Sequence, residues 1–217
     1  MSASLALVYR GPAAAPGCPE AVARVLRTAG FDVAYVGRGG DVPLDARSLA
    51  QASLYAQPGG GSLKPAWRRL RRHADVITDF VAGGGRYLGF CLGAYLAGHT
   101  PGLGLLDGDT DQYIVSPGAE IAHESAAVLE VAWAGHPRRV YFQDGCTFTT
   151  GPSTEVVAHY ANGAPAAVVN CYGRGRVAAV GPHPEATDDW YADDGLSPVE
   201  PATDDLALDL VRRLVAA

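Results

Sequence analysis

The sequence predicts an α/β protein with a mostly parallel central sheet, helices on both faces, and added antiparallel strands or hairpins in the second half. In the first half, short apolar runs alternate with segments of helical periodicity, as in strands joined by right-handed crossover helices. In the second half, apolar runs follow one another through short turns. With 217 residues, of which 48% are hydrophobic and 18% charged, the chain can bury a sizeable core. We expect one domain over residues 1–217.

Strands and helices alternate up to residue 97. Pro19 suits an early helical position, and Gly30 follows the end of that helix. Apolar residues at helical spacing from Trp67 to Phe80 predict a long helix, which Gly83-Gly84-Gly85 ends. The expected strands are Ser4–Tyr9, Phe31–Val36, Ser53–Gln57 and Arg86–Phe90, and the expected helices are Pro19–Ala29, Lys64–Val81 and Cys91–Ala97.

The second half is predicted to be mostly strands. Gly173-Arg174-Gly175-Arg176 lies between two apolar runs, so it is predicted to be a hairpin turn rather than a phosphate-binding loop. The expected strands are Val128–Trp133, Arg139–Phe142, Glu155–Tyr160, Ala166–Tyr172 and Arg176–Val180, and a closing helix is expected at Asp204–Val215.

Charge and composition exclude several classes of function. The net charge is −6, so we expect no nucleic-acid partner, and an arginine cluster at residues 68–72 is interpreted as an exposed helix face. No run of about 18 apolar residues predicts a membrane span, and the first residues lack the basic start of a signal peptide, so a cytoplasmic protein is expected. No metal and no cofactor are expected, because the four cysteines lack CxxC spacing and the histidines lack paired spacing.

The segment Gly89-Phe90-Cys91-Leu92-Gly93 has the pattern of a nucleophile elbow. Such a turn lifts the central residue above a sheet where a strand gives way to a helix, and the flanking glycines relieve crowding. The start of a helix also favours a thiolate at Cys91. We therefore predict that Cys91 is a nucleophile; the alternative is a buried, unreactive cysteine.

The segment His183-Pro184-Glu185 supplies the two groups that a nucleophilic thiol needs. Pro184 favours an extended backbone at His183, and residues two apart in an extended chain point the same way. Glu185 can then hold one ring nitrogen of His183, and the other nitrogen faces the thiol. We predict that Cys91, His183 and Glu185 form a catalytic triad.

The loop Pro58-Gly59-Gly60-Gly61 follows the third expected strand. Glycines let backbone N–H groups approach a carbonyl oxygen, so Gly59 and Gly60, with the N–H of Leu92, are predicted to form an oxyanion hole. Two other segments keep open interpretations. Cys18 either packs at a helix start or lines the pocket as a second thiol, and Gln143-Asp144-Gly145 is either a turn or part of the pocket wall.

Together these motifs resemble the class I glutamine amidotransferase superfamily. More narrowly, Gly84–Gly98 (G-G-R-Y-L-G-F-C-L-G-A-Y-L-A-G) is similar to the amidotransferase-like domain at the N-terminus of biotin–protein ligases. The resemblance implies a flavodoxin-like, three-layer αβα fold and a Cys-His-Glu triad. Glutamine-using members usually carry glutamine where Tyr95 stands here, two residues after the second elbow glycine. Tyr95 is therefore a predicted substrate contact that argues against free glutamine as the substrate.

The leading hypothesis is a cysteine-dependent amide hydrolase or amidotransferase-like enzyme. Its substrate would be a small-molecule or peptide amide, and a partner protein is a further expectation. The main alternative is a non-catalytic binding or regulatory module that retains the fold. A weaker alternative is a thiol stress protein or glyoxalase-type relative that shares the elbow cysteine.

Overall fold

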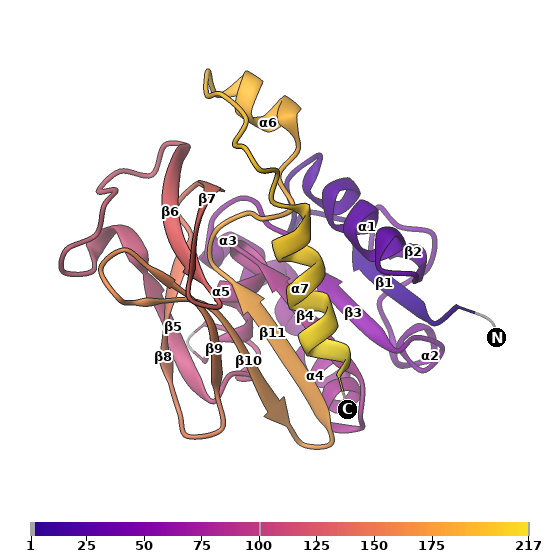
Figure 1. Cartoon of the computed structure of the whole chain (residues 1–217). Coiled ribbons are helices and arrows are strands. Elements are labelled where there is room, and N and C mark those ends of the chain that lie inside the picture. The colour runs from indigo at the N-terminus through magenta and orange to yellow at the C-terminus, as the bar shows by residue number, and fades with distance from the viewer. Residues whose placement is uncertain (1–2, 100, 217) are drawn as a thin grey trace.

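The computed structural model describes residues 3–99 and 101–216, and its main feature is a nine-stranded sheet (Figure 1). The strand order is β2-β1-β3-β4-β11-β10-β9-β6-β7. The first five of these strands are mutually parallel, and the remaining pairings are antiparallel. The sheet strands are β1 (Leu5–Tyr9), β2 (Asp32–Val36), β3 (Leu54–Gln57), β4 (Arg86–Phe90), β6 (Ala127–Trp133), β7 (His136–Phe142), β9 (Glu155–Tyr160), β10 (Pro165–Tyr172) and β11 (Gly175–Val180).

Helices cover both faces of the parallel half. The side chains of α1 and α7 join one buried apolar cluster, and those of α3, α4 and α5 join the other. The protein therefore has the three layers that the alternation predicts. The helices are α1 (Cys18–Thr28), α2 (Ala46–Leu49), α3 (Leu63–Leu70), α4 (Ala74–Ala82), α5 (Leu92–Ala97), α6 (Asp188–Asp193) and α7 (Asp204–Val215).

One predicted helix is wrong as a single element. The segment Lys64–Val81 forms α3 and α4, which are separated by a 3-10 turn at Arg71–His73. Helix α3 packs against α5, whereas α4 packs across β4, β11 and α2. Because the two pieces have different neighbours, tertiary packing breaks a pattern that is helical in periodicity alone. The arginines of this region are exposed, as predicted.

Three elements carry too little apolar periodicity to be predicted. A separate two-stranded sheet pairs β5 (Gly108–Gln112) with β8 (Cys146–Thr150), and β5 reads G-D-T-D-Q. Helix α6 reads D-D-W-Y-A-D and projects at the top of Figure 1.

The hairpin between β10 and β11 is as predicted, with Gly173 at a φ of +56° in its turn.

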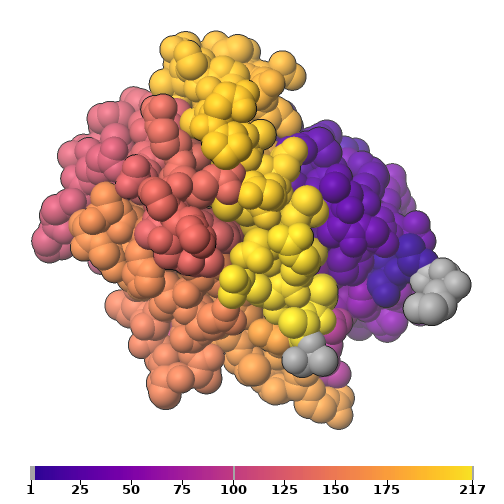
Figure 2. Space-filling view, viewed as in Figure 1, coloured from indigo at the N-terminus to yellow at the C-terminus, as the bar shows by residue number. Residues whose placement is uncertain are grey.

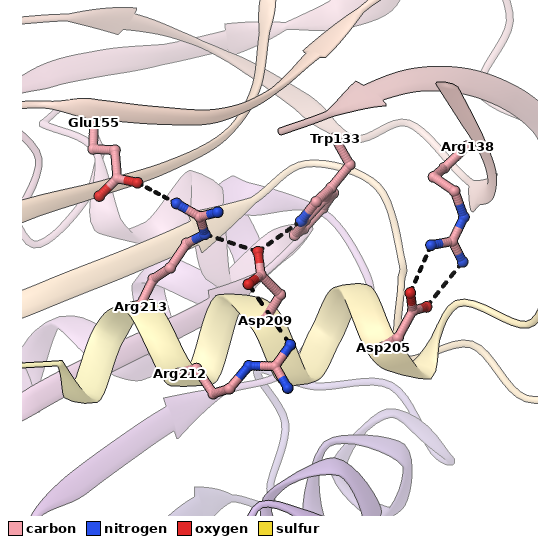
Figure 3. A network of polar contacts seen from close by, with 7 residues as sticks. All are labelled: Trp133, Arg138, Glu155, Asp205, Asp209, Arg212 and Arg213. Atoms are coloured by element: carbon pink, nitrogen blue, oxygen red, sulfur yellow. Dashed lines mark hydrogen bonds and ion pairs between the residues drawn. The ribbon is translucent and has the colours of Figure 1, made fainter. Parts of the chain in front are cut away.

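Helix α7 joins the two halves of the sheet, and Figure 2 shows it as a yellow strip between the indigo and orange parts of the surface. Asp209 in its middle accepts hydrogen bonds from Trp133 Nε1 of β6 (2.9 Å) and from Arg213 Nε (2.7 Å), as Figure 3 shows. Arg213 also bonds Glu155 of β9. On its other side α7 packs against α1 and β11. It therefore ties the antiparallel strands to the parallel ones.

Replacing Asp209 by alanine is expected to lower the free energy of unfolding by about 1–3 kcal/mol. The Trp133 side chain is buried, so its indole N–H would lose its acceptor without gaining water. Urea unfolding measures the effect. Asp209→Asn keeps an acceptor oxygen and should lose less, and an alanine variant as stable as the parent would contradict this role for Asp209.

No helix among residues 3–99 and 101–216 is both long and apolar enough to cross a membrane.

Candidate functional site

Cys91 occupies a sharp turn between β4 and α5. Its φ of +46° and ψ of −103° lie in a region that side-chain-bearing residues rarely adopt, and its N–H donates to the Val180 carbonyl of β11 at 2.8 Å. Strained backbone of this kind persists only where the surrounding structure enforces it, and it is concentrated at functional sites. Helix α5 begins at Leu92, so Cys91 stands immediately before the helix rather than within it.

The two elbow glycines allow this turn to form. A Cβ at Gly89 would lie 2.5 Å from the Gly93 carbonyl oxygen, and a Cβ at Gly93 would lie 2.0 Å from the Gln57 carbonyl oxygen. Both distances are far shorter than any van der Waals contact. Strand β3, strand β4 and helix α5 therefore approach one another closely only because neither glycine has a side chain.

His183 and Glu185 follow the end of β11. His183 Nδ1 lies 2.8 Å from Glu185 Oε1, and the two side chains are 4% and 0% exposed. The N–H of His183 donates to the Tyr141 carbonyl at 2.8 Å, which fixes the backbone of this segment to β7. The carboxylate is thus in position to hold the imidazole in one orientation.

Cys91 and His183 lie beside each other. A Cβ at Gly59 would be 2.7 Å from His183 Cε1 and 3.5 Å from Cys91 Cβ, so one small volume borders both residues. Burial lowers the pKa of His183, but the Glu185 carboxylate, the negative charge of a Cys91 thiolate and hydrogen bonds to both outweigh it and raise the pKa to about 10. The arrangement can hold an imidazolium beside Cys91 at neutral pH.

These residues open onto a cavity of about 1450 Å³. Cys91, His183, Gly60, Leu92 and Tyr95 all line it, whereas Gly59 lies against the His183 ring. Gly60 has a φ of +111°, and a Cβ there would overlap Ala15, so the glycine loop also needs its glycines for close approach. The structure thus brings together every residue that the sequence nominated for the site.

Two segments with open interpretations also reach the cavity. The Gln143 carbonyl lies 3.6 Å from Cys91 Sγ, and both Gln143 and Asp144 line the wall. Cys18 is buried at the start of α1 and lines the cavity as well. Burial raises the pKa of the Cys18 thiol, and the negative charges of Glu185 and Cys91 raise it further, so Cys18 stays protonated.

Sequence reasoning missed two aromatic neighbours of His183. The ring centroids of Trp190 and Tyr141 lie 5.3 and 5.8 Å from that of His183, both with edge-to-face geometry. The Tyr141 hydroxyl in turn bonds Asp194. Trp190 lies on α6, which has too little apolar periodicity to be predicted from the sequence. Both rings pack against the imidazole.

No cluster of three or more histidine, cysteine, aspartate or glutamate side chains within residues 3–99 and 101–216 has a geometry that could hold a metal ion.

Comparisons with known proteins show what this chain is similar to. Residues 5–102 match the family model described as biotin-protein ligase, N terminal. The chain is 34% identical over 97 residues to the imidazole glycerol phosphate synthase subunit HisH of Cyanothece sp., an alignment that covers 41% of this chain and 46% of that protein. The chain thus spans about half the length of the curated relatives it matches.

Solved structures match over nearly the whole chain. A glutamine amidotransferase crystal structure aligns with a TM-score of 0.64 and 17% identity, covering 95% of this chain and 98% of the other. A glutamine amidotransferase from Thermotoga maritima aligns with a TM-score of 0.65 and 16% identity, covering 99% of both chains. These matches confirm the predicted flavodoxin-like fold, antiparallel strands included.

Proposed function

We propose that the chain belongs to the class I glutamine amidotransferase-like superfamily and that it is an amidotransferase-type enzyme, which cleaves an amide C–N bond through Cys91. The observation that carries this proposal is the buried His183–Glu185 pair beside a cysteine held in a strained elbow. A buried carboxylate, an imidazole and a thiol in contact are the components of a nucleophilic triad. The single domain over residues 1–217 would contain the complete catalytic site.

In the proposed reaction, Cys91 Sγ attacks the amide carbonyl carbon, and His183 holds the thiol proton. The C–N bond breaks as the imidazolium passes that proton to the leaving nitrogen, which leaves a thioester on Cys91. Water then gives a proton to His183 and attacks the thioester, the C–S bond breaks, and the proton returns to the sulfur. Glu185 keeps the ring oriented and stabilises its positive charge throughout.

The oxyanion of each tetrahedral intermediate needs hydrogen-bond donors. We propose that the N–H groups of Leu92 and Gly60 are these donors. Gly59 has no side chain, so the loop can lie against Cys91 and His183. Leu92 is the first residue of α5, so its N–H has no carbonyl partner within the helix.

A partner protein is part of the proposal. The relatives are named as a subunit of a synthase, which supports an assembly in which a second chain uses the released amine. Tyr95 lines the cavity where the resemblance places a glutamine side chain, which argues for an amide other than free glutamine. All four cysteines are free thiols, consistent with the reducing cytoplasm as the proposed compartment.

Alkylation of Cys91 by iodoacetamide, followed by peptide mass spectrometry, tests the proposed mechanism. At pH 7 Cys91 is expected to react at least about tenfold faster than the exposed Cys171 of the same chain, because the His183 imidazolium stabilises the thiolate. In His183→Ala the Cys91 rate should fall to the Cys171 rate or below it.

The same experiment addresses the main alternative. A Cys91 that reacts no faster than Cys171, and whose rate does not depend on His183, would reject the triad. A binding or regulatory module that retains the fold would then be the better account.

A further inference from the structure

Asp144 is the ionisable residue of the Gln143-Asp144 wall segment, which contacts the proposed nucleophile through Gln143. It directly follows Gln143, whose carbonyl lies 3.6 Å from Cys91 Sγ, and it lines the same cavity. An acyl group bound to Cys91 would therefore share its cavity with Asp144.

The Asp144 carboxylate is held in one place. Gln112 Nε2 donates to its Oδ1 at 2.7 Å, and the Tyr95 hydroxyl donates to its backbone carbonyl at 3.2 Å. Tyr95, which stands where the resemblance places a glutamine, thus supports Asp144. A fixed carboxylate loses little conformational entropy when it binds a ligand, so it is well suited to recognition.

No cation balances this carboxylate. Among the described residues Asp144 forms no ion pair, and Glu124, a second carboxylate on the cavity wall, acts on it as a like charge. Burial, with the repulsion from Glu124, raises the pKa of the Asp144 carboxyl. A positively charged ligand group between the two carboxylates would offset both effects.

In the whole cavity, as around Asp144, carboxylates outnumber basic side chains. Among the described residues, three basic side chains line it: His183, Arg24 and Lys64. His183 is already paired with Glu185, and Arg24 with Asp204, both at 2.8 Å. A substrate carboxylate would therefore meet little unbalanced positive charge here. Six carboxylates line the cavity, and only Glu20 has a basic partner among the described residues: Glu20, Glu124, Asp144, Asp189, Asp193 and Asp194.

We propose that the substrate is a small amide that carries a protonated amino group and no free carboxylate near the scissile bond, and that Asp144 binds this amino group. This inference rests on the proposed function of Cys91 and names its substrate class. Aromatic faces near His183 add to the same preference, because Trp190 lines the cavity between Asp189 and Asp193 and can contact a cation through its ring.

Methanethiosulfonate reagents test the proposal without a known substrate. The Cys91 sulfur attacks the sulfenyl sulfur, a disulfide forms, and methanesulfinate leaves. The rate therefore measures how readily each reagent enters the cavity and reaches Cys91. Three reagents are compared: 2-(trimethylammonium)ethyl and 2-sulfonatoethyl methanethiosulfonate, which are of similar size and opposite charge, and the smaller, neutral methyl methanethiosulfonate. Rates at Cys91 are divided by those at the exposed Cys171 in the same sample.

We expect the normalised rate of the cationic reagent to exceed that of the anionic reagent by about tenfold at low salt. The preference should shrink at high salt. Asp144→Asn should reduce it at least about threefold, and asparagine retains the acceptor oxygen for Gln112, so the loop is preserved. Asp32→Asn is the matched control, because it removes the same charge from an exposed residue at the start of β2, outside the cavity.

The outcomes separate the two proposals. If the neutral reagent modifies Cys91 rapidly, and the cationic and anionic reagents react at equal normalised rates, the proposed substrate class is overturned. The proposed role of Cys91 as nucleophile is then still supported. A charge preference that Asp32→Asn reduces as much as Asp144→Asn would overturn the role of Asp144. A Cys91 that resists all three reagents would overturn both proposals.

Discussion

Replacing Gly59 by alanine is expected to lower the alkylation rate of Cys91 at least about tenfold while leaving the fold intact. The new Cβ would lie 2.7 Å from His183 Cε1, so the imidazole must move. Edge-to-face contacts with Tyr141 and Trp190 and the bond to Glu185 leave the ring no equivalent position. The imidazolium would then lose its contact with the Cys91 sulfur. Cys91 would consequently be alkylated no faster than an ordinary thiol.

Iodoacetamide kinetics at Cys91 and thermal unfolding of the same sample measure this effect. Gly59 is outside the set of residues with positive φ, so alanine there adds no backbone strain. Gly39→Ala is the matched control: its φ is also ordinary, and its nearest neighbour is the flexible Arg10 side chain at 3.4 Å. Wild-type alkylation in Gly59→Ala would show that His183 does not control Cys91.

Replacing Gly93 by alanine is expected to lower the free energy of unfolding by about 3 kcal/mol and to disturb the elbow. A Cβ at Gly93 would lie 2.0 Å from the Gln57 carbonyl oxygen, which belongs to β3. Gln57 cannot yield, because it is fully buried, accepts from the Tyr55 hydroxyl at 2.7 Å and donates to the Ala13 carbonyl at 2.8 Å. The strain must therefore displace α5, and Cys91 immediately before it.

Urea unfolding and Cys91 alkylation together check this prediction. Both the free energy of unfolding and the alkylation rate of Cys91 should fall in Gly93→Ala. In Gly39→Ala the free energy of unfolding should change by no more than about 0.5 kcal/mol, and the alkylation rate by no more than about twofold. Unchanged urea unfolding would refute the close packing of α5 on β3. Normal reactivity despite lower stability would show that the elbow tolerates the displacement.

Local patterns were sufficient to predict most of the fold. Strand β4, strand β9 and helix α7 have the bounds expected from the sequence, because each has a clear apolar periodicity and a sharp glycine or charged boundary. Patterns of this kind failed where packing decides the structure. The periodicity of residues 64–81 does not reveal that its two ends face different neighbours, and β5 is polar enough to be mistaken for a loop.

The candidate site divides in the same way. Cys91, His183 and Glu185 could be nominated from sequence, because a glycine-flanked elbow and an extended His-Pro-Glu segment are local conformations with local signatures. Their catalytic roles remain predictions. The sequence by itself determined the layered α/β fold and these reactive groups, because both depend on residues close together in the chain.

Only the tertiary structure decided what surrounds those groups. Gln143 meets Cys91 across a separation of 52 residues, and Trp190 reaches His183 from a short charged helix. Asp144 becomes a fixed carboxylate, with no ion pair among the described residues, only where Gln112 and Tyr95 converge on it. Contacts between distant segments depend on how strands and helices pack, and no local periodicity encodes them. The charge and shape of the cavity, and hence the substrate class we propose, follow from that packing.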